Sequence, residues 1–180
     1  MVEIPTTKNL DGLGAVAVTE IDGITYWGHN SNMFGRGLTT GSRGLRLGLD
    51  PEFQKKWKTY LTEKGVFRVE LGETVEIHGV KNGTHDRFYR YDMDAEKAIK
   101  AINDSMGHAE VQLLLRIVDG INSNGGTMPK NLLIFVDRTP CWACAWVLRR
   151  LKKHFGIENI RLVFIPRPSS TTNGLNYFDL

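Results

Sequence analysis

Cysteine is nearly absent from this chain of 180 residues, which contains only Cys141 and Cys144. This count excludes a small secreted scaffold held together by several disulfides, and the close spacing of the pair makes any chemistry that they share local. Proline is scarce as well, at 6 residues, and no apolar run approaches the roughly 18 residues that a membrane span needs. We therefore expect one soluble globular domain over residues 1–180 that does not cross a membrane.

Neither sign of charge dominates, with 23 basic and 20 acidic side chains and a formal net charge of +3. The distribution is more informative than the sum, because a Gly-rich segment over residues 35–49 carries Arg36, Arg43 and Arg46 and no acid. Such a segment suits an anionic ligand, and it is equally typical of an exposed loop.

Hydrophobic patterning in the first two thirds of the chain predicts both strands and helices. Two β-branched and aromatic runs joined by Asp22-Gly23 are typical of a hairpin. Asp50 and Pro51 offer an N-cap and a first-turn proline for a helix. The expected elements are a hairpin over 12–31, a helix over 51–64, one or two strands over 66–80, and helices over 94–104 and 108–121.

The C-terminal part predicts a unit of strand, helix and strand. Residues 131–137 form a nearly continuous apolar run, typical of a central strand that is buried on both faces. A helix over 141–155 and a second strand over 161–165 follow, so the two strands are expected to be parallel with a right-handed crossover. Too few residues remain for another crossover helix, which makes a last strand over 175–178 antiparallel. The predicted fold class is α/β, with a mixed sheet of about five strands.

A candidate metal site lies at two predicted helix N-termini. Cys141 and Cys144 begin the 141–155 helix, where unpaired amide groups and the helix dipole favour the thiolate form. His108 opens another helix, so that two sulfurs and one nitrogen can meet. Tetrahedral zinc with three protein ligands keeps one position for water, whereas a structural site needs a fourth ligand, and no other histidine has a finger-like spacing to His108. Glu110 is placed to carry protons between that water and a leaving amine.

These residues carry a resemblance to a known family. The chain reads His108-Ala109-Glu110 and later Pro140-Cys141-Trp142-Ala143-Cys144, which is similar to the H-x-E and P-C-x-x-C signature of zinc deaminases. In these motifs and in the order of its elements, the chain resembles the cytidine deaminase superfamily. The resemblance implies α/β/α layers, one zinc ion held by His108, Cys141 and Cys144 plus water, and Glu110 as general acid and base.

The resemblance also implies which residues touch the substrate, although it does not extend over the whole chain. Residues 34–92 have no counterpart in the family and are interpreted as an insertion within the single domain. The implied substrate contacts are Asn30, Ala109, Thr139, Pro140 and Trp142.

The polar C-terminal end and the missing final crossover look most like the bacterial polymorphic-toxin deaminases, which act on nucleic acid. That resemblance implies hydrolytic conversion of cytosine to uracil in single- or double-stranded DNA, with the target base flipped out of the stack. It further implies a monomeric toxin domain of a larger secreted protein, delivered into the cytoplasm of a target cell and paired with an immunity protein. The candidate nucleic-acid contacts are Arg36, Arg43, Arg46, Phe88 and Tyr89.

Other interpretations of the same residues stay open. The substrate is alternatively a free nucleoside or nucleotide, or RNA, with cytosine or adenine as the base. Cys141 and Cys144 alone match a thioredoxin-like redox pair, which leaves His108 and Glu110 without a role. A zinc-stabilised binding module without catalytic activity is a third interpretation. Residues 88–91 suit an amphipathic strand as well as a nucleic-acid stacking surface.

Overall fold

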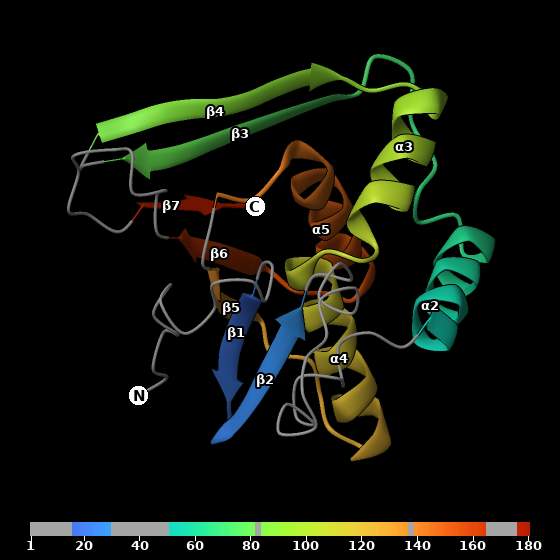
Figure 1. The fold of residues 1–180 in the computed structure, drawn as a ribbon, viewed down its shortest axis with the longest axis vertical. Coiled ribbons are helices and arrows are strands. Elements are labelled where there is room, and N and C mark those ends of the chain that lie inside the picture. Colours follow the sequence, from blue (N-terminus) through green and yellow to red (C-terminus); the bar gives the residue numbers. More distant parts are fainter. Residues whose placement is uncertain (1–15, 30–50, 82–83, 137–138, 165–175) are drawn as a thin grey trace, which may run out of the picture.

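The computed structural model describes residues 16–29, 51–81, 84–136, 139–164 and 176–180 (Figure 1). No helix within these ranges is long and apolar enough to cross a membrane. The strands are β1 (Val16–Ile21), β2 (Ile24–His29), β3 (Thr74–Lys81), β4 (Thr84–Asp92), β5 (Asn131–Val136), β6 (Asn159–Phe164) and β7 (Asn176–Asp179). The helices are α2 (Pro51–Glu63), α3 (Ala95–Ser105), α4 (Ala109–Ser123) and α5 (Trp142–His154).

Local sequence signals predicted the hairpin and the strand-helix-strand unit correctly. β1 and β2 pair antiparallel around Asp22 and Gly23, whose φ angles of 51° and 79° suit the type I′ turn that matches strand twist. β5 and β6 pair in parallel across α5, and β7 returns antiparallel to β6. The last-strand prediction is therefore confirmed, because the short remaining chain left no room for a second crossover.

The expected strand number of about five is wrong, since the described residues form a sheet of seven strands in the order β2-β1-β5-β6-β7-β3-β4. The difference comes from the segment interpreted as an insertion. Its β3 pairs with β4 as a long antiparallel hairpin and joins the sheet through β7, where Gly79 faces Phe178. Residues far from the C-terminal unit in sequence thus extend the same sheet.

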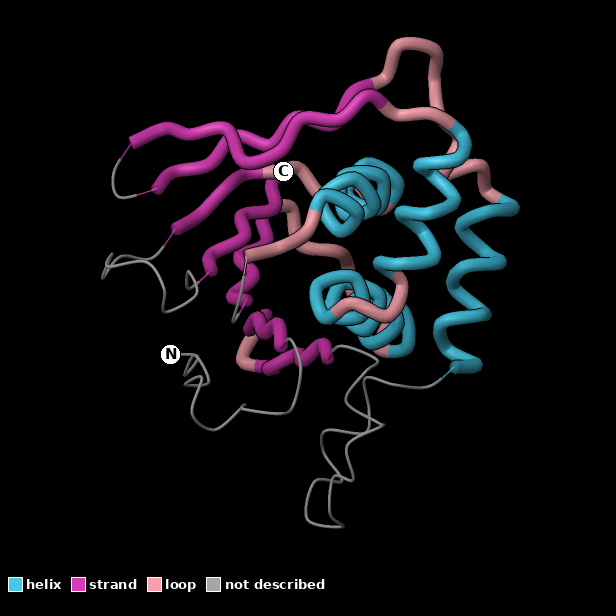
Figure 2. The backbone as a smooth tube through the Cα atoms, turned by 45° about the horizontal axis from the view of Figure 1, so that its top comes forward, coloured by secondary structure: helices cyan, strands magenta, loops and turns pink. Residues whose placement is uncertain are grey.

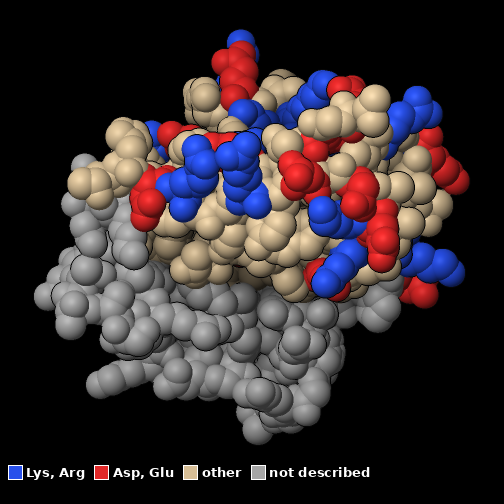
Figure 3. All heavy atoms as spheres, turned by 90° about the horizontal axis from the view of Figure 1, so that it is seen from above, with Lys and Arg blue, Asp and Glu red and all other residues tan. Residues whose placement is uncertain are grey.

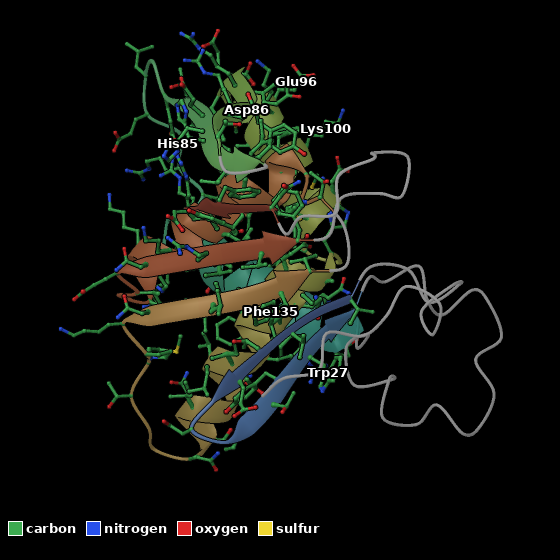
Figure 4. All side chains as sticks on the ribbon, turned by 90° about the vertical axis from the view of Figure 1, so that its left-hand side faces the viewer. Trp27, His85, Asp86, Glu96, Lys100 and Phe135 are labelled. Atoms are coloured by element: carbon green, nitrogen blue, oxygen red, sulfur yellow. The ribbon has the colours of Figure 1, made fainter. Side chains whose placement is uncertain are left out.

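The helices lie on one face of the sheet, within the part of the chain that the structure describes (Figure 2). In Figure 4, strands β1, β5 and β6 stand in front of the helices and Phe135 is labelled on this part of the sheet. Along β5 the side chains alternate, with Ile134 fully buried and Leu133 44% exposed. The prediction of a strand buried on both faces is therefore wrong, and three α/β/α layers are not formed by the described residues. An apolar run does not reveal which of its two faces a helix covers.

Helix α4 is the centre of the core and packs on β1, β2 and β5. The outer helix α2 is tied to it by Arg116, whose guanidinium lies 4.0 Å from the ring centre of Phe53. Trp57 on α2 also packs edge-on against Phe155, with ring centres 6.0 Å apart. These contacts hold α2 against the middle of α4 and the C-terminal end of α5, whereas the predicted metal ligands lie at the N-terminal ends of α4 and α5.

Candidate metal centre

Two helix N-termini meet at the candidate site, as the sequence predicted. Cys141 is the N-cap of α5, and its Sγ accepts a hydrogen bond from the amide of Cys144 at 3.4 Å. His108 is the N-cap of α4, and its side chain makes no capping hydrogen bond. The imidazole is therefore free of its own helix and turns toward the cysteines. Both residues sit where unpaired amides and the helix dipole favour negative charge.

The donor atoms of His108, Cys141 and Cys144 lie within 4.8 Å of one another. Nδ1 of His108 is 3.0 Å from Sγ of Cys144 and 3.4 Å from Sγ of Cys141. Ligands bound 2.0–2.3 Å from a tetrahedral ion lie roughly 3.5 Å apart, so a small movement of these side chains admits a metal ion. Two soft sulfurs and one imidazole suit zinc chemically. These three residues fit a metal site.

Glu110 lies beside the donor atoms and is almost completely buried, at 4% exposure. The thiol of Cys144 points at its Oε2 across 3.6 Å. Burial raises the pKa of this carboxyl group, because the nearby polar groups do not offset the loss of water. A carboxyl group that is buried next to metal ligands and can hold a proton is suited to proton transfer.

The two cysteines differ in their ionisation when no metal is bound. The hydrogen bond from the Cys144 thiol, followed by that from His108, lowers the pKa of Cys141 to about 4. Burial raises the pKa of Cys144 well above its usual value. The pKa of His108 is raised, first by its hydrogen bond to Cys141. One thiolate is thus ready for a cation, and metal binding has to release the other proton.

Strand β4 reaches the metal centre through Tyr89. Its hydroxyl donates a hydrogen bond to the carbonyl oxygen of Pro140, the residue before the first cysteine. Burial, and then the negative charge of Cys141, raises the pKa of Tyr89 to about 12. The register of β3 and β4 shifts at Ile77, so that Phe88 is an extra residue on β4. This bulge changes the direction in which the neighbouring side chains point.

Aromatic rings continue outward from this contact. The Tyr91 ring lies 5.1 Å from that of Trp142, measured between centres, with 37° between the planes. Tyr91 is also 6.5 Å from Tyr89, in a stacked orientation. Trp142 directly follows Cys141 and is partly buried.

The other predicted site residues fall into three groups. Ala109 and Pro140 are buried at the centre, and Thr139 is exposed beside it. Phe88 packs against Phe164 and Phe178, with ring centres 5.8 Å away in both cases, and so belongs to an aromatic part of the core. The remaining predicted contacts lie outside the described residues, namely Asn30, Arg36, Arg43 and Arg46.

The structure adds one residue that the sequence interpretation did not assign to the site. Gln112 is completely buried, and its Nε2 donates to the carbonyl oxygen of Met106, which holds the turn before His108. Its polar side chain between Val111 and Leu113, within an apolar stretch of α4, is the signal that could have pointed to it. Tyr91 belongs to the aromatic run over residues 88–91 that the sequence already offered as a stacking surface, and the structure brings it against Trp142.

The fold and the site together define a mixed α/β protein with a His-Cys-Cys group that can hold a metal ion. No protein-family model, no curated protein and no solved structure matches this chain.

Proposed function

We propose that this protein is a zinc-dependent deaminase that hydrolyses cytosine to uracil in DNA. The observation that carries the proposal is the convergence of His108, Cys141 and Cys144 with the buried carboxyl group of Glu110 beside them. A redox pair of cysteines has no use for the histidine or for the carboxyl group. A purely structural metal site has no use for a buried acid that is aimed at the ligands.

The chemistry divides between the metal and Glu110. A zinc ion held by the three ligands supplies Lewis acidity, which makes water nucleophilic near neutral pH. Glu110 takes a proton from the attacking water and gives it to N3 of the cytosine ring. A second proton transfer through Glu110 lets the amine leave C4 as ammonia, so that cytosine and water become uracil and ammonia. Burial favours this role, because it leaves the carboxyl group no competing water.

Support for a polymeric substrate comes from β4, which borders the metal centre. Glu76 on β3 is shared by Arg87 at 3.0 Å and Arg90 at 3.8 Å, and Asp86 and Asp92 balance the charge of these two arginines along β4. Seen from above, basic and acidic side chains are interspersed over the described surface (Figure 3). We therefore propose local phosphate contacts rather than a uniformly basic face. The partners in this proposal are DNA and an immunity protein, for a monomeric toxin domain delivered by a larger secreted protein.

The test is sequencing of a mixed pool of single- and double-stranded DNA and RNA after treatment with the zinc-loaded protein. Free cytidine and adenosine are assayed in parallel by release of ammonia. Glu110→Gln is the matched control, because it keeps the shape of the side chain and removes its acid function. We expect conversion of cytosine to uracil in DNA with the native protein and none with Glu110→Gln, while both bind one zinc ion.

Three other results would redirect the proposal. Conversion confined to RNA or to free nucleosides would keep the chemistry and change the substrate. Equal activity of the native protein and Glu110→Gln would assign the activity to a contaminant. Zinc binding without any conversion would leave a zinc-stabilised binding module.

A further inference from the structure

We propose that Tyr91 and Trp142 form a stacking site for a nucleobase next to the one that enters the metal centre. This inference rests on the proposed function, and it names a specificity element that comes from the 74–92 hairpin. The observation behind it is a row of three aromatic rings in which Tyr91 lies between Tyr89 and Trp142.

Both ends of the row lie next to the segment that carries the metal ligands. Tyr89 is half-buried and bound through its hydroxyl to the carbonyl oxygen of Pro140. Trp142 is the first residue of α5 and directly follows the ligand Cys141. The hydrogen bond holds the Tyr89 ring and the core packs against the Trp142 ring, which makes the row a rigid support. A rigid aromatic surface loses little conformational entropy when a ligand stacks on it.

The middle ring of the row is exposed to solvent. Tyr91 remains 38% exposed although it packs against Trp142, and it lies on β4, an edge strand of the sheet. Every nucleobase has a π-face, so such a ring can accept a base of any sequence.

The position of the row selects the base that it contacts. The target base has to reach Glu110 and the three donor atoms, which lie on the inner side of Cys141. Tyr91 is 38% exposed, whereas Glu110 and Cys144 are buried, so Tyr91 lies nearer to the surface than they do. A base that stacks on Tyr91 is therefore a neighbour of the target, and the site holds the strand while the target is turned inward.

The proposal is tested by a thermodynamic cycle between Tyr91 and single bases of the DNA. The protein is the zinc-loaded full chain carrying Glu110→Gln, which keeps the oligonucleotide intact. Its affinity for a fluorescent single-stranded oligonucleotide with one cytosine is measured by anisotropy. Related oligonucleotides lack the base immediately before or after the cytosine. Tyr91→Ala, Tyr91→Phe and Tyr60→Ala are compared in this background.

We expect Tyr91→Ala to weaken binding of the intact oligonucleotide roughly 5- to 150-fold, which corresponds to the loss of one stacked base. Removing one flanking base should weaken the binding of the Glu110→Gln chain, which is the reference protein, by a similar factor. The same removal should not weaken the binding of the Tyr91→Ala variant any further, because both changes delete the same contact. Tyr91→Phe keeps the ring and should bind within about twofold of the reference. Tyr60, on α2 and 37% exposed, is the matched surface tyrosine, and Tyr60→Ala should bind like the reference.

The proposed stacking site would be overturned if the losses of affinity caused by Tyr91→Ala and by the missing base were additive. Equal affinities of Tyr91→Ala and Tyr60→Ala for the intact oligonucleotide would also overturn it. Failure of the protein to bind any oligonucleotide would overturn it as well. Conversion of cytosine by the native chain is scored separately. If Tyr91 and a flanking base are coupled in binding but cytosine is not converted, the proposed catalysis is contradicted and the stacking site is retained. If cytosine is converted but Tyr91 is not coupled to a flanking base, the stacking site is contradicted and the proposed catalysis is retained.

Discussion

Gly28 on β2 lies directly against the backbone of Ala109 on α4. A Cβ atom at Gly28 would come within 2.0 Å of the carbonyl oxygen of Ala109 and 2.6 Å of the amide nitrogen of Leu113. Ala109 stands between His108 and Glu110, so this approach brings the end of the first hairpin to the metal centre. Only glycine permits that separation.

Gly28→Ala is therefore expected to lower the free energy of unfolding by about 3 kcal/mol, because neither backbone can yield without moving its element. Urea unfolding followed by circular dichroism measures the change. Gly126→Ala is the control, since the atom nearest to its added Cβ is 3.4 Å away. If Gly28→Ala were as stable as Gly126→Ala, the hairpin would not be packed against α4 in this way.

Removing the metal is expected to lower the thermal stability of the protein. A ligand that is present at 100 times its dissociation constant and binds only the folded state contributes about 2.7 kcal/mol. Chelation should therefore lower the melting temperature of the zinc-loaded chain, and zinc should restore it. Cys144→Ser should bind less than one zinc per chain and lose most of the response. A chelator response as large in Cys144→Ser as in the native chain would place the metal elsewhere.

Glu73→Gln is expected to destabilise the protein in a pH-dependent way. Burial acts to raise the pKa of Glu73, but hydrogen bonds from the Glu70 amide, the Trp146 indole and Arg150 outweigh it and lower the pKa. The pKa of Glu73 is therefore lower in the folded protein than in the unfolded chain. The carboxylate stabilises the fold fully at pH values above the unfolded-state pKa, and this stabilisation is lost as the pH falls through the folded-state pKa.

We expect Glu73→Gln to cost about 1 kcal/mol at pH 7. Measured by urea unfolding, the difference from the native chain should shrink as the pH falls below about 4. Glu70→Gln, three residues away and exposed, should change stability little at either pH. A cost of Glu73→Gln that stays the same at low pH would show that packing, not charge, is responsible.

Tyr89→Phe removes the hydroxyl that binds the Pro140 carbonyl oxygen and is expected to cost about 1 kcal/mol of stability. Burial, with the charge of Cys141 adding to it, raises the pKa of Tyr89 to about 12 in the folded chain. Because this pKa is raised, the contribution is fully present below the unfolded value of about 10 and is lost as pH rises through the folded value.

This dependence is checked by measuring the free energy of unfolding of the native protein and of Tyr89→Phe at a series of pH values from 8 upward. The difference between native and Tyr89→Phe should be constant up to about pH 10 and decline above it. Tyr91→Phe is the control on the same strand, because its hydroxyl makes no hydrogen bond to any residue that the structure describes. A difference for Tyr89→Phe no larger than for Tyr91→Phe would contradict the contact.

The local elements were predictable from sequence because their signals act over a few residues. Asp22-Gly23 can adopt the positive φ angles of a tight hairpin turn. Asp94 caps α3 by accepting from the amide of Lys97 at 2.7 Å. The spacing of Cys141 and Cys144 puts both sulfurs at the first turn of one helix. In each case neighbouring residues determine the geometry.

Long-range arrangement was decided only by the tertiary structure. His108 and Cys141 are separated by 33 positions, and their approach depends on the packing of α4 and α5. The alternation of the 74–92 hairpin predicted strands but not their pairing with β7, nor the contact of Tyr89 with Pro140. An apolar run likewise did not say that no helix among the described residues covers one face of β5. The physical reason is that periodicity records which side chains are apolar, whereas the partner that covers them is set by the packing of the whole chain.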